Sequence, residues 1–172
     1  MKPTHRTSIV VRCVLALAAL CAVGVQAGPV EDTAQAETAI RSGDFVTAMN
    51  LLRKAADLNH PPAQARLADL LLAADFRADA LALYQKAADQ GDAAGEFGLG
   101  RMFADGLGVA RDHAAALQWY RKAEAKNHAP AIDALARAYR DGYLGLPKDP
   151  EKSRELQARA KALFDAAAGT AK

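Results

Sequence analysis

The stretch that decides the fold is residues 99–149, which read LGRMFADGLGVARDHAAALQWYRKAEAKNHAPAIDALARAYRDGYLGLPKD. The segment 99–106 returns as 135–142, at an offset of 36 residues. A glycine-containing loop follows each copy and ends on an aspartate, Asp112 or Asp149. Self-similarity at a fixed period of about 20–50 residues is typical of stacked repeats. The sequence therefore predicts an all-α, right-handed α/α solenoid of antiparallel helix pairs.

The repeat extends outward from this stretch in both directions. A basic residue followed by alanine recurs at Lys54, Lys86, Lys122 and Arg159. Ten residues earlier stand Asp44, Phe76, Asp112 and Asp149. The three aspartates suit the N-cap of a helix, and Asp75 is expected to serve in place of Phe76. This spacing predicts eight helices, at residues 31–42, 44–58, 62–74, 77–90, 93–104, 112–126, 129–140 and 149–168.

Turn residues and small residues recur at the same period. Asn59, Gly91 and Asn127 are expected to be left-handed just past helix ends. Small residues at Gly100 and its equivalents should let helices approach, whereas Trp119 is expected to pack in one apolar seam shared by neighbouring pairs. The positions with a structural role in the repeat are predicted to be Leu99, Gly100, Gly106, Gly108, Asp112, Trp119, Tyr120, Ala123, Leu135, Gly142, Gly145 and Asp149.

The N-terminal segment has the layout of a secretory signal peptide. Lys2 and Arg6 precede an apolar run, and Val25-Gln26-Ala27 offers small residues before a cut ahead of Gly28. The alternative is an uncleaved anchor, but Arg12 limits the uninterrupted apolar run to residues 13–25, short of the ~20 needed to span a membrane. The predicted organisation is a signal peptide at 1–27, a capping helix at 28–43, the repeat domain at 44–168 and a tail at 169–172.

Cleavage near Ala27 would change the chemistry of the chain. Both cysteines, Cys13 and Cys21, would leave, so no disulfide or cysteine nucleophile is expected. Without Lys2, Arg6 and Arg12 the 22 basic side chains fall to 19 against 20 acidic ones, a net charge of −1. No electrostatic footprint for nucleic acid remains, and the membrane is expected to be contacted only through the signal segment before cleavage. The predicted location is periplasmic or secreted.

These residues resemble the Sel-like repeat family (the sel-1 type), a relative of the tetratricopeptide repeat. The resemblance rests on the loop 105–109 leading to Asp112, then Trp119-Tyr120 followed by Lys122-Ala123, and on the second loop 141–149. It is clear over residues 80–149 and extends in degenerate form over 44–160. The first unit departs from it, because it lacks the four-residue glycine loop. The resemblance implies helical pairs and protein–protein adaptor work, often at the bacterial envelope.

Candidate catalytic and metal-binding residues give weak signals. His60, His113 and His128 are expected to be surface residues, because no second ligand stands at helical spacing from any of them. The glycine loops lack the ending and the preceding strand of a phosphate-binding loop. The only serines after the signal, Ser42 and Ser153, belong to no Ser-x-x-Lys or Gly-x-Ser-x-Gly motif. The sequence therefore predicts no enzyme, no cofactor and no metal.

One face could bind another protein. Arg101 and Arg137 share a repeat position and should line up on the first-helix face. Together with neighbouring residues they would form a groove for an extended or helical acidic segment, with arginines pairing to carboxylates. The candidate partner-binding residues are Arg66, Phe97, Arg101, Asp133, Arg137, Tyr139 and Arg140. The predicted function is a non-catalytic adaptor for a partner protein or peptide. The alternatives are a structural accessory of an envelope polysaccharide or secretion assembly, and a hydrolase acting on β-lactam or cell-wall substrates.

Overall fold

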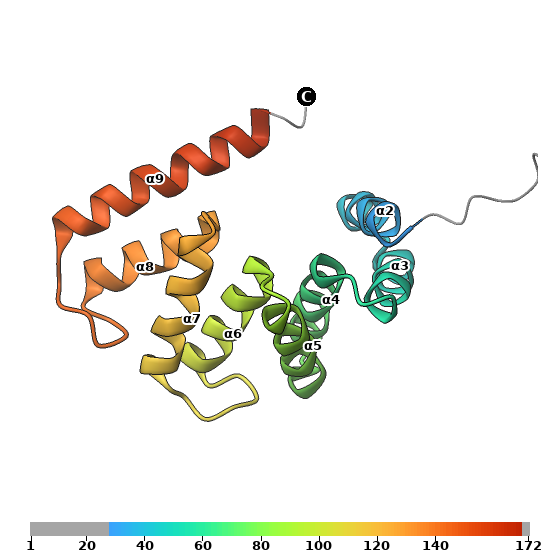
Figure 1. The fold of residues 1–172 in the computed structure, drawn as a ribbon, viewed down its shortest axis with the longest axis horizontal. Coiled ribbons are helices and arrows are strands. Elements are labelled where there is room, and N and C mark those ends of the chain that lie inside the picture. Colours follow the sequence, from blue (N-terminus) through green and yellow to red (C-terminus); the bar gives the residue numbers. More distant parts are fainter. Residues whose placement is uncertain (1–27, 170–172) are drawn as a thin grey trace, which may run out of the picture.

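The computed structural model describes residues 28–169 and places eight α-helices within that range. They are α2 (Pro29–Ser42), α3 (Phe45–Asp57), α4 (Pro61–Ala73), α5 (Arg77–Asp89), α6 (Ala93–Asp105), α7 (His113–Ala125), α8 (Ala129–Asp141) and α9 (Pro150–Gly169). Successive helices pack on each other as a row of pairs (Figure 1). The predicted all-α helix pairs are confirmed, and each boundary lies within two residues of its predicted position.

The predicted signal peptide, residues 1–27, lies outside the described residues, as do residues 170–172. Within residues 28–169 no helix combines the length and the apolar character that crossing a membrane requires.

Helix starts follow the predicted caps, with one exception. Asp44 accepts a hydrogen bond from the backbone of Thr47, Asp112 from Ala115 and Asp149 from Lys152. Asp92 caps α6 in the same way, a role that was not predicted. The expected cap at Asp75 is wrong. Its carboxylate pairs with Arg77 at 2.7 Å, and α5 starts from Phe76 without a side-chain cap.

The turns between helix pairs adopt the predicted left-handed conformation. Asn59 and Asn127 both have φ of 59°, and Gly91 has φ of 78°. Each turn is short, because a residue in the left-handed conformation ends the helix and lets the chain reverse its direction within two or three residues. The next helix then starts beside the one that ended.

The longer loops inside the third and fourth pairs fold back over the preceding pair. Gly106, Gly108, Gly142 and Gly145 all have positive φ, between 70° and 77°. A side chain added at Gly108 would lie 3.0 Å from Cβ of Arg77, the first residue of α5. In the next loop, the ring of Tyr143 lies 4.7 Å from that of His113, the first residue of α7. Each glycine loop therefore covers the start of the second helix in the preceding pair.

The conformation of Gly106 gives a first testable expectation. Gly106→Val should destabilise the protein by about 2 kcal/mol, because a β-branched side chain at φ of 71° clashes with its own backbone. Chemical denaturation measures this loss. Gly106→Asn is the matched control and should cost clearly less, since Asn59 and Asn127 already adopt this conformation. Equal stability of the valine variant and the wild type would contradict the expectation.

The buried core forms two clusters that meet at α6, and not the single seam expected from the sequence. The first cluster runs from α2 to α6 and includes Leu52, Tyr84 and Leu99. The second runs from α6 to α9 and includes Tyr120 and Leu135.

The buried aromatic position of the repeat is the tyrosine and not the tryptophan. Leu52, Tyr84 and Tyr120 are buried at equivalent positions, whereas Trp119 is only half-buried at the edge of the first cluster. The Trp119 ring packs against that cluster and carries the Lys122 ammonium 3.8 Å from its centroid. The larger packing contribution therefore comes from Tyr84 and Tyr120.

Two glycines of α6 allow those tyrosines to lie flat against the helix. A Cβ added at Gly98 would lie 2.2 Å from the Tyr84 ring, and one added at Gly100 would lie 2.5 Å from the Tyr120 ring. Gly100 thus plays the expected role of a close-approach residue, whereas the role of Gly98 was not predicted. The Tyr84 ring is further fixed because its hydroxyl donates a 2.6 Å hydrogen bond to Asp69.

A row of buried polar residues also runs through the stack and was not predicted. Asp32, Gln64 and Glu96 each occupy the fourth position of a first helix and are almost fully buried. Each one contacts a residue in the last turn or at the C-cap of the second helix of the same pair. The pairs are Asp32 with Lys54 at 3.0 Å, Gln64 with Gln90 at 2.8 Å and Glu96 with Lys126 at 2.6 Å.

Candidate functional site

A cleft lies between α6 and α8, the first helices of two successive pairs. Its volume is about 570 Å³, its floor includes α7, and the loop after α8 closes one end. It is lined by Phe97, Arg101, Ala104, Asp105, Tyr120, Ala134, Arg137, Ala138, Asp141, Gly142, Tyr143 and Leu144. The sequence predicted Phe97, Arg101 and Arg137 as members of one face, and the structure brings these three together.

An aromatic cluster centred on Phe97 forms one wall of the cleft. The Phe97 ring lies 5.7 Å from that of Tyr120 and 5.2 Å from that of His128, measured between centroids. The guanidinium of Arg101 stands over the same ring at 5.9 Å. The position of Arg101 is therefore set by packing, and its polar edge is left available to the cleft.

The Tyr120 hydroxyl is a polar group at the cleft without a protein partner. Only 6% of Tyr120 is exposed, and burial, followed by the nearby Asp105 carboxylate, raises its pKa to about 12. No residue between 28 and 169 makes a hydrogen bond with this hydroxyl. It is therefore a neutral phenol that can donate one hydrogen bond and accept another from a molecule in the cleft.

The two arginines of the cleft are ion-paired but make no hydrogen bond within the described range. Arg101 approaches Asp69 at 3.9 Å, and Arg137 approaches Asp133 at 3.1 Å. A guanidinium has five N–H donors, so both keep donors for a ligand. The Asp141 carboxylate, in contrast, already accepts two hydrogen bonds from Arg140 at 2.9 and 3.0 Å.

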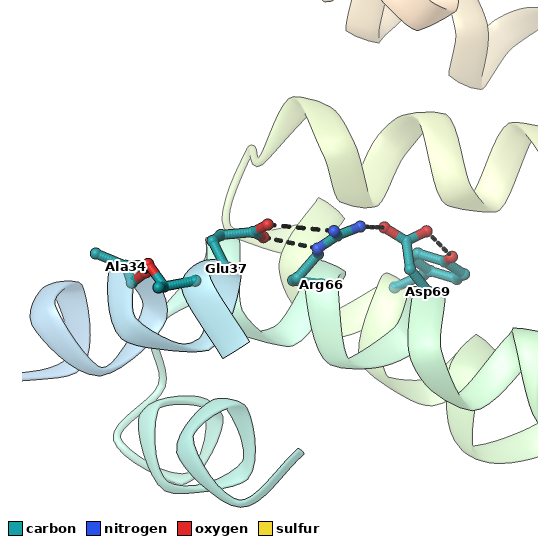
Figure 2. A network of polar contacts seen from close by, with 6 residues as sticks. Ala34, Glu37, Arg66 and Asp69 are labelled. Carbon is teal, nitrogen blue, oxygen red and sulfur yellow. Dashed lines mark hydrogen bonds and ion pairs between the residues drawn. The ribbon is translucent and has the colours of Figure 1, made fainter. Parts of the chain in front are cut away.

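Arg66 lies outside this cleft and is hydrogen-bonded to two carboxylates. Figure 2 shows its guanidinium between Glu37 and Asp69, with hydrogen bonds of 2.6 and 3.2 Å to the two Glu37 oxygens. Asp69 lies 3.5 Å away on the other side. The predicted part of Arg66 in partner binding stays a prediction, and in this structure its guanidinium serves these two contacts. This network ties the capping helix α2 to α4.

The remaining predicted binding residues are also placed outside the cleft lining. Tyr139 packs against the second core cluster, and Arg140 is bonded to Asp141. Asp133 touches the site only through its ion pair with Arg137. Of the seven predicted binding residues, Phe97, Arg101 and Arg137 line the cleft.

Sequence reasoning missed much of the cleft. Asp105 and Asp141 stand at equivalent positions of the repeated motif, and that repetition could have marked them as neighbours of Arg101 and Arg137. Tyr143 and Leu144 belong to a loop whose path depends on tertiary contacts. Tyr143 is fixed by a 2.9 Å hydrogen bond from its hydroxyl to the backbone carbonyl of Ala104.

The histidines give no metal site within the described residues, where no cluster of three or more potential ligands occurs. His128 is not the plain surface residue expected. Its ring is half-buried against Phe97, and its Nδ1 is buried without a hydrogen-bond partner in that range. Burial lowers the pKa of His128 below 6.5, and the carboxylates of Asp92, Asp69 and Glu96 only partly oppose this.

This shift predicts a loss of stability in acid. As the pH falls below 6.5, the unfolded chain takes up a proton at His128 before the folded chain does, so the free energy of unfolding decreases. His128→Phe keeps a ring against Phe97 and should show a smaller decrease between pH 7.5 and 5. Denaturation at both pH values measures the difference. Identical pH dependence in the two proteins would contradict the expected contribution of His128.

Comparison with known proteins agrees with this architecture. The model of the Sel1 repeat matches residues 39–60, 61–92, 93–128 and 129–168. A search of curated proteins finds no match. A Sel1 repeat protein from Oxalobacter formigenes is similar in structure, with a TM-score of 0.69 and 23% identity over 80% of this chain and 57% of its own.

A second solved structure is a protective antigen present in uropathogenic Escherichia coli strains, described as displaying an SLR fold. Its TM-score is 0.64 and its identity 25%, over 83% of this chain and 32% of its own. The chain therefore spans about a third to somewhat over half of the length of these two proteins. Sel1 repeats commonly mediate protein–protein interactions and are generally non-catalytic. With four matched units and eight helices in successive pairs, the chain belongs to the Sel1 repeat family.

Proposed function

We propose that this chain is an exported, non-catalytic adaptor that holds a partner polypeptide in the cleft between α6 and α8. The observation that carries the proposal is the set of unused hydrogen-bonding groups around an apolar floor. Arg101, Arg137 and Tyr120 all offer donors, and none of them makes a hydrogen bond within residues 28–169. The Arg101 and Arg137 side chains are 40% and 55% exposed, so water solvates their donors in the free protein, and the carboxylates of a bound segment would replace that water.

The chemistry of the cleft favours an acidic segment that also carries an apolar side chain. Carboxylates would accept hydrogen bonds from Arg101 and Arg137, which are half-exposed and only ion-paired. An apolar side chain of the segment would rest on Phe97 and Leu144. Asp141 does not repel such a segment strongly, because Arg140 already neutralises it.

The test combines crosslinking with charge reversal. A photoreactive phenylalanine analogue at Tyr143, which lines the cleft and is 40% exposed, should crosslink the partner in an envelope extract. Arg101→Glu/Arg137→Glu should remove this crosslink, because both guanidinium donors become carboxylates. Arg53→Glu/Arg121→Glu is the matched control, since both residues are exposed on second helices.

Retention of the same crosslinked partner by the Arg101/Arg137 variant would overturn the assignment of the cleft. Loss of the crosslink in both double variants would mean that net charge, and not the cleft, governs capture. Circular dichroism and thermal melting of all variants establish that each one is folded before capture is compared.

The export part of the proposal rests on the layout of residues 1–27 and has its own test. The mature protein is expected to begin at Gly28 and to be periplasmic or secreted. Intact mass spectrometry of the protein recovered from a periplasmic fraction measures this. A mass that includes Met1 to Ala27 in the membrane fraction would indicate the anchored alternative.

A further inference from the structure

Two tyrosines occupy equivalent places in successive helix pairs, but their hydroxyls differ in their partners. Tyr84 is the eighth residue of α5, and Tyr120 is the eighth residue of α7. The Tyr84 hydroxyl donates a 2.6 Å hydrogen bond to Oδ1 of Asp69, the ninth residue of α4, which is the first helix of the same pair. Only 6% of Tyr120 is exposed, and its hydroxyl has no such acceptor within residues 28–169.

The acceptor is missing because the ninth residue of the first helix changes its charge along the stack. This position holds Glu37 in α2, Asp69 in α4, Arg101 in α6 and Arg137 in α8. The helix α4 therefore offers a carboxylate to its tyrosine, whereas α6 offers a guanidinium, which has no acceptor atom. Tyr120 thus has the place of its counterpart in α5 without the carboxylate of that counterpart.

The surroundings of Asp69 show how this stack holds a carboxylate in front of the tyrosine. Besides the hydroxyl of Tyr84, Arg101 of the following pair approaches Asp69 at 3.9 Å. Figure 2 shows Arg66 beside the same carboxylate, at 3.5 Å. One pair further along, Arg137 takes the position of Arg101 and lines the cleft. The phenol and the arginine of the following pair therefore recur around the cleft, but the aspartate does not.

We propose that the cleft contains a subsite for a single carboxylate, which an aspartate side chain of the partner segment fills. This carboxylate would accept a hydrogen bond from the Tyr120 hydroxyl and pair with the guanidinium groups of Arg137 and Arg101. The chain's own Asp69 is the precedent for an aspartate in this place. The inference rests on the proposed function of the cleft and specifies the group that the partner presents there.

The charge around the subsite favours one carboxylate over a run of them. Asp105 also lines the cleft and lies close enough to Tyr120 to help raise the pKa of its hydroxyl. The Asp105 side chain is exposed and makes no ion pair in the part of the chain that the structure describes. It would repel a second acidic side chain of the partner and attract a basic one. The segment is therefore expected to present a single aspartate with neutral or basic neighbours.

The first test supplies the missing carboxylate from within the chain. Arg101→Asp places a carboxylate at the position of α6 that corresponds to Asp69 in α4. Tyr120→Phe should change the melting temperature of the wild type by less than about 1 °C, because the hydroxyl it removes has no protein partner. In the Arg101→Asp background the same change should lower the melting temperature by about 5 °C, because it now removes a hydrogen bond to a carboxylate. Tyr84→Phe is the positive control, since it removes such a bond from the wild type.

The second test uses the acetylated and amidated tetrapeptide LADL, which copies residues 67–70 and carries one carboxylate. The Nε–H resonances of Arg101 and Arg137 and the ring resonances of Tyr120 report its binding to the purified protein. We expect saturable shifts with a Kd of about 1 mM, and a Kd about tenfold higher in Tyr120→Phe. Asp105→Asn should lower the Kd about threefold, because it removes a repulsive charge beside the subsite.

Two further peptides identify the group that is bound. The amidated peptide LANL replaces the carboxylate by an amide and should bind at least about tenfold more weakly than LADL. The same LANL peptide with a free C-terminus offers a terminal carboxylate instead of a side-chain one. Tighter binding of this last peptide than of LADL would overturn the assignment to an aspartate side chain.

Three results would overturn the subsite itself. They are the absence of saturable shifts with LADL, an unchanged Kd in Tyr120→Phe, and an equal effect of Tyr120→Phe on melting in the wild type and in Arg101→Asp. None of them decides whether the cleft holds a partner, because that proposal fails only if the crosslink from position 143 survives Arg101→Glu/Arg137→Glu. If that crosslink survives while LADL binds through Tyr120, the proposed function fails and the subsite stands.

Discussion

Lys126→Met should destabilise the protein by about 3 kcal/mol, because it leaves the Glu96 carboxylate buried without a counter-charge. Glu96 is 4% exposed, and its Oε2 already lacks a hydrogen-bond partner within residues 28–169. The Lys126 ammonium bonds both to Glu96, at 2.6 Å, and to the carbonyl of Gly91, at 2.8 Å. Urea denaturation of the wild type and the variant measures the loss.

The preceding helix pair supplies the matched control. Gln64 and Gln90 occupy the positions of Glu96 and Lys126 and form a neutral amide pair at 2.8 Å. The double variant Glu96→Gln/Lys126→Gln copies this arrangement and should recover most of the stability, whereas Lys126→Gln alone should not. If Lys126→Met lost less than about 1 kcal/mol, the buried charge would not be the reason for the pair.

Gly98→Ala should cost about 2 kcal/mol, even though alanine favours a helix over glycine by about 1 kcal/mol. The added Cβ would lie 2.2 Å from Cε1 of Tyr84. The ring is 1% exposed, and moving it would break the hydroxyl bond to Asp69. Thermal or chemical unfolding measures the change.

The Tyr84→Ala background separates this clash from other effects. With the ring removed, Gly98→Ala should become stabilising, because only the gain in helix propensity remains. The sign of the Gly98→Ala effect is therefore expected to reverse between the two backgrounds. The same sign in both would show that Tyr84 does not restrict position 98.

The parts of this fold that could be predicted from sequence depend on local chemistry. Asp44, Asp112 and Asp149 cap helices, and Asn59 and Asn127 form left-handed turns, because these roles need only the residue and its neighbours. The repeat then fixes the helix order, since equivalent residues must take equivalent places. Asp75 does not cap α5, because its carboxylate forms an ion pair with Arg77 instead. Local cap propensity does not determine which of these two interactions the carboxylate makes.

The candidate site depended on tertiary contacts and was predicted only in part. Periodicity placed Arg101 and Arg137 on one face, with Arg66 expected near it, but the sequence could not tell which guanidinium already had a partner. Glu37 lies 29 residues from Arg66, so their pairing follows from how α2 packs on α4. Tyr120 was expected to be core and is indeed buried, but the sequence could not reveal that its hydroxyl reaches the cleft.

The buried polar pairs have a consequence for how such a chain can change its length by duplication. Each of the first three helix pairs carries both members of its own polar pair, as with Gln64 and Gln90 or Glu96 and Lys126, and the fourth pair has the apolar Ile132 at this position. From the preceding pair and its turn, these side chains take neutral oxygen acceptors: the Ala56 carbonyl and the Asn59 side chain for the glutamines, and the Gly91 carbonyl for Lys126. A pair copied or lost as a whole would therefore leave no orphaned ion inside the array, and the gene can gain or lose whole units without passing through an unstable intermediate.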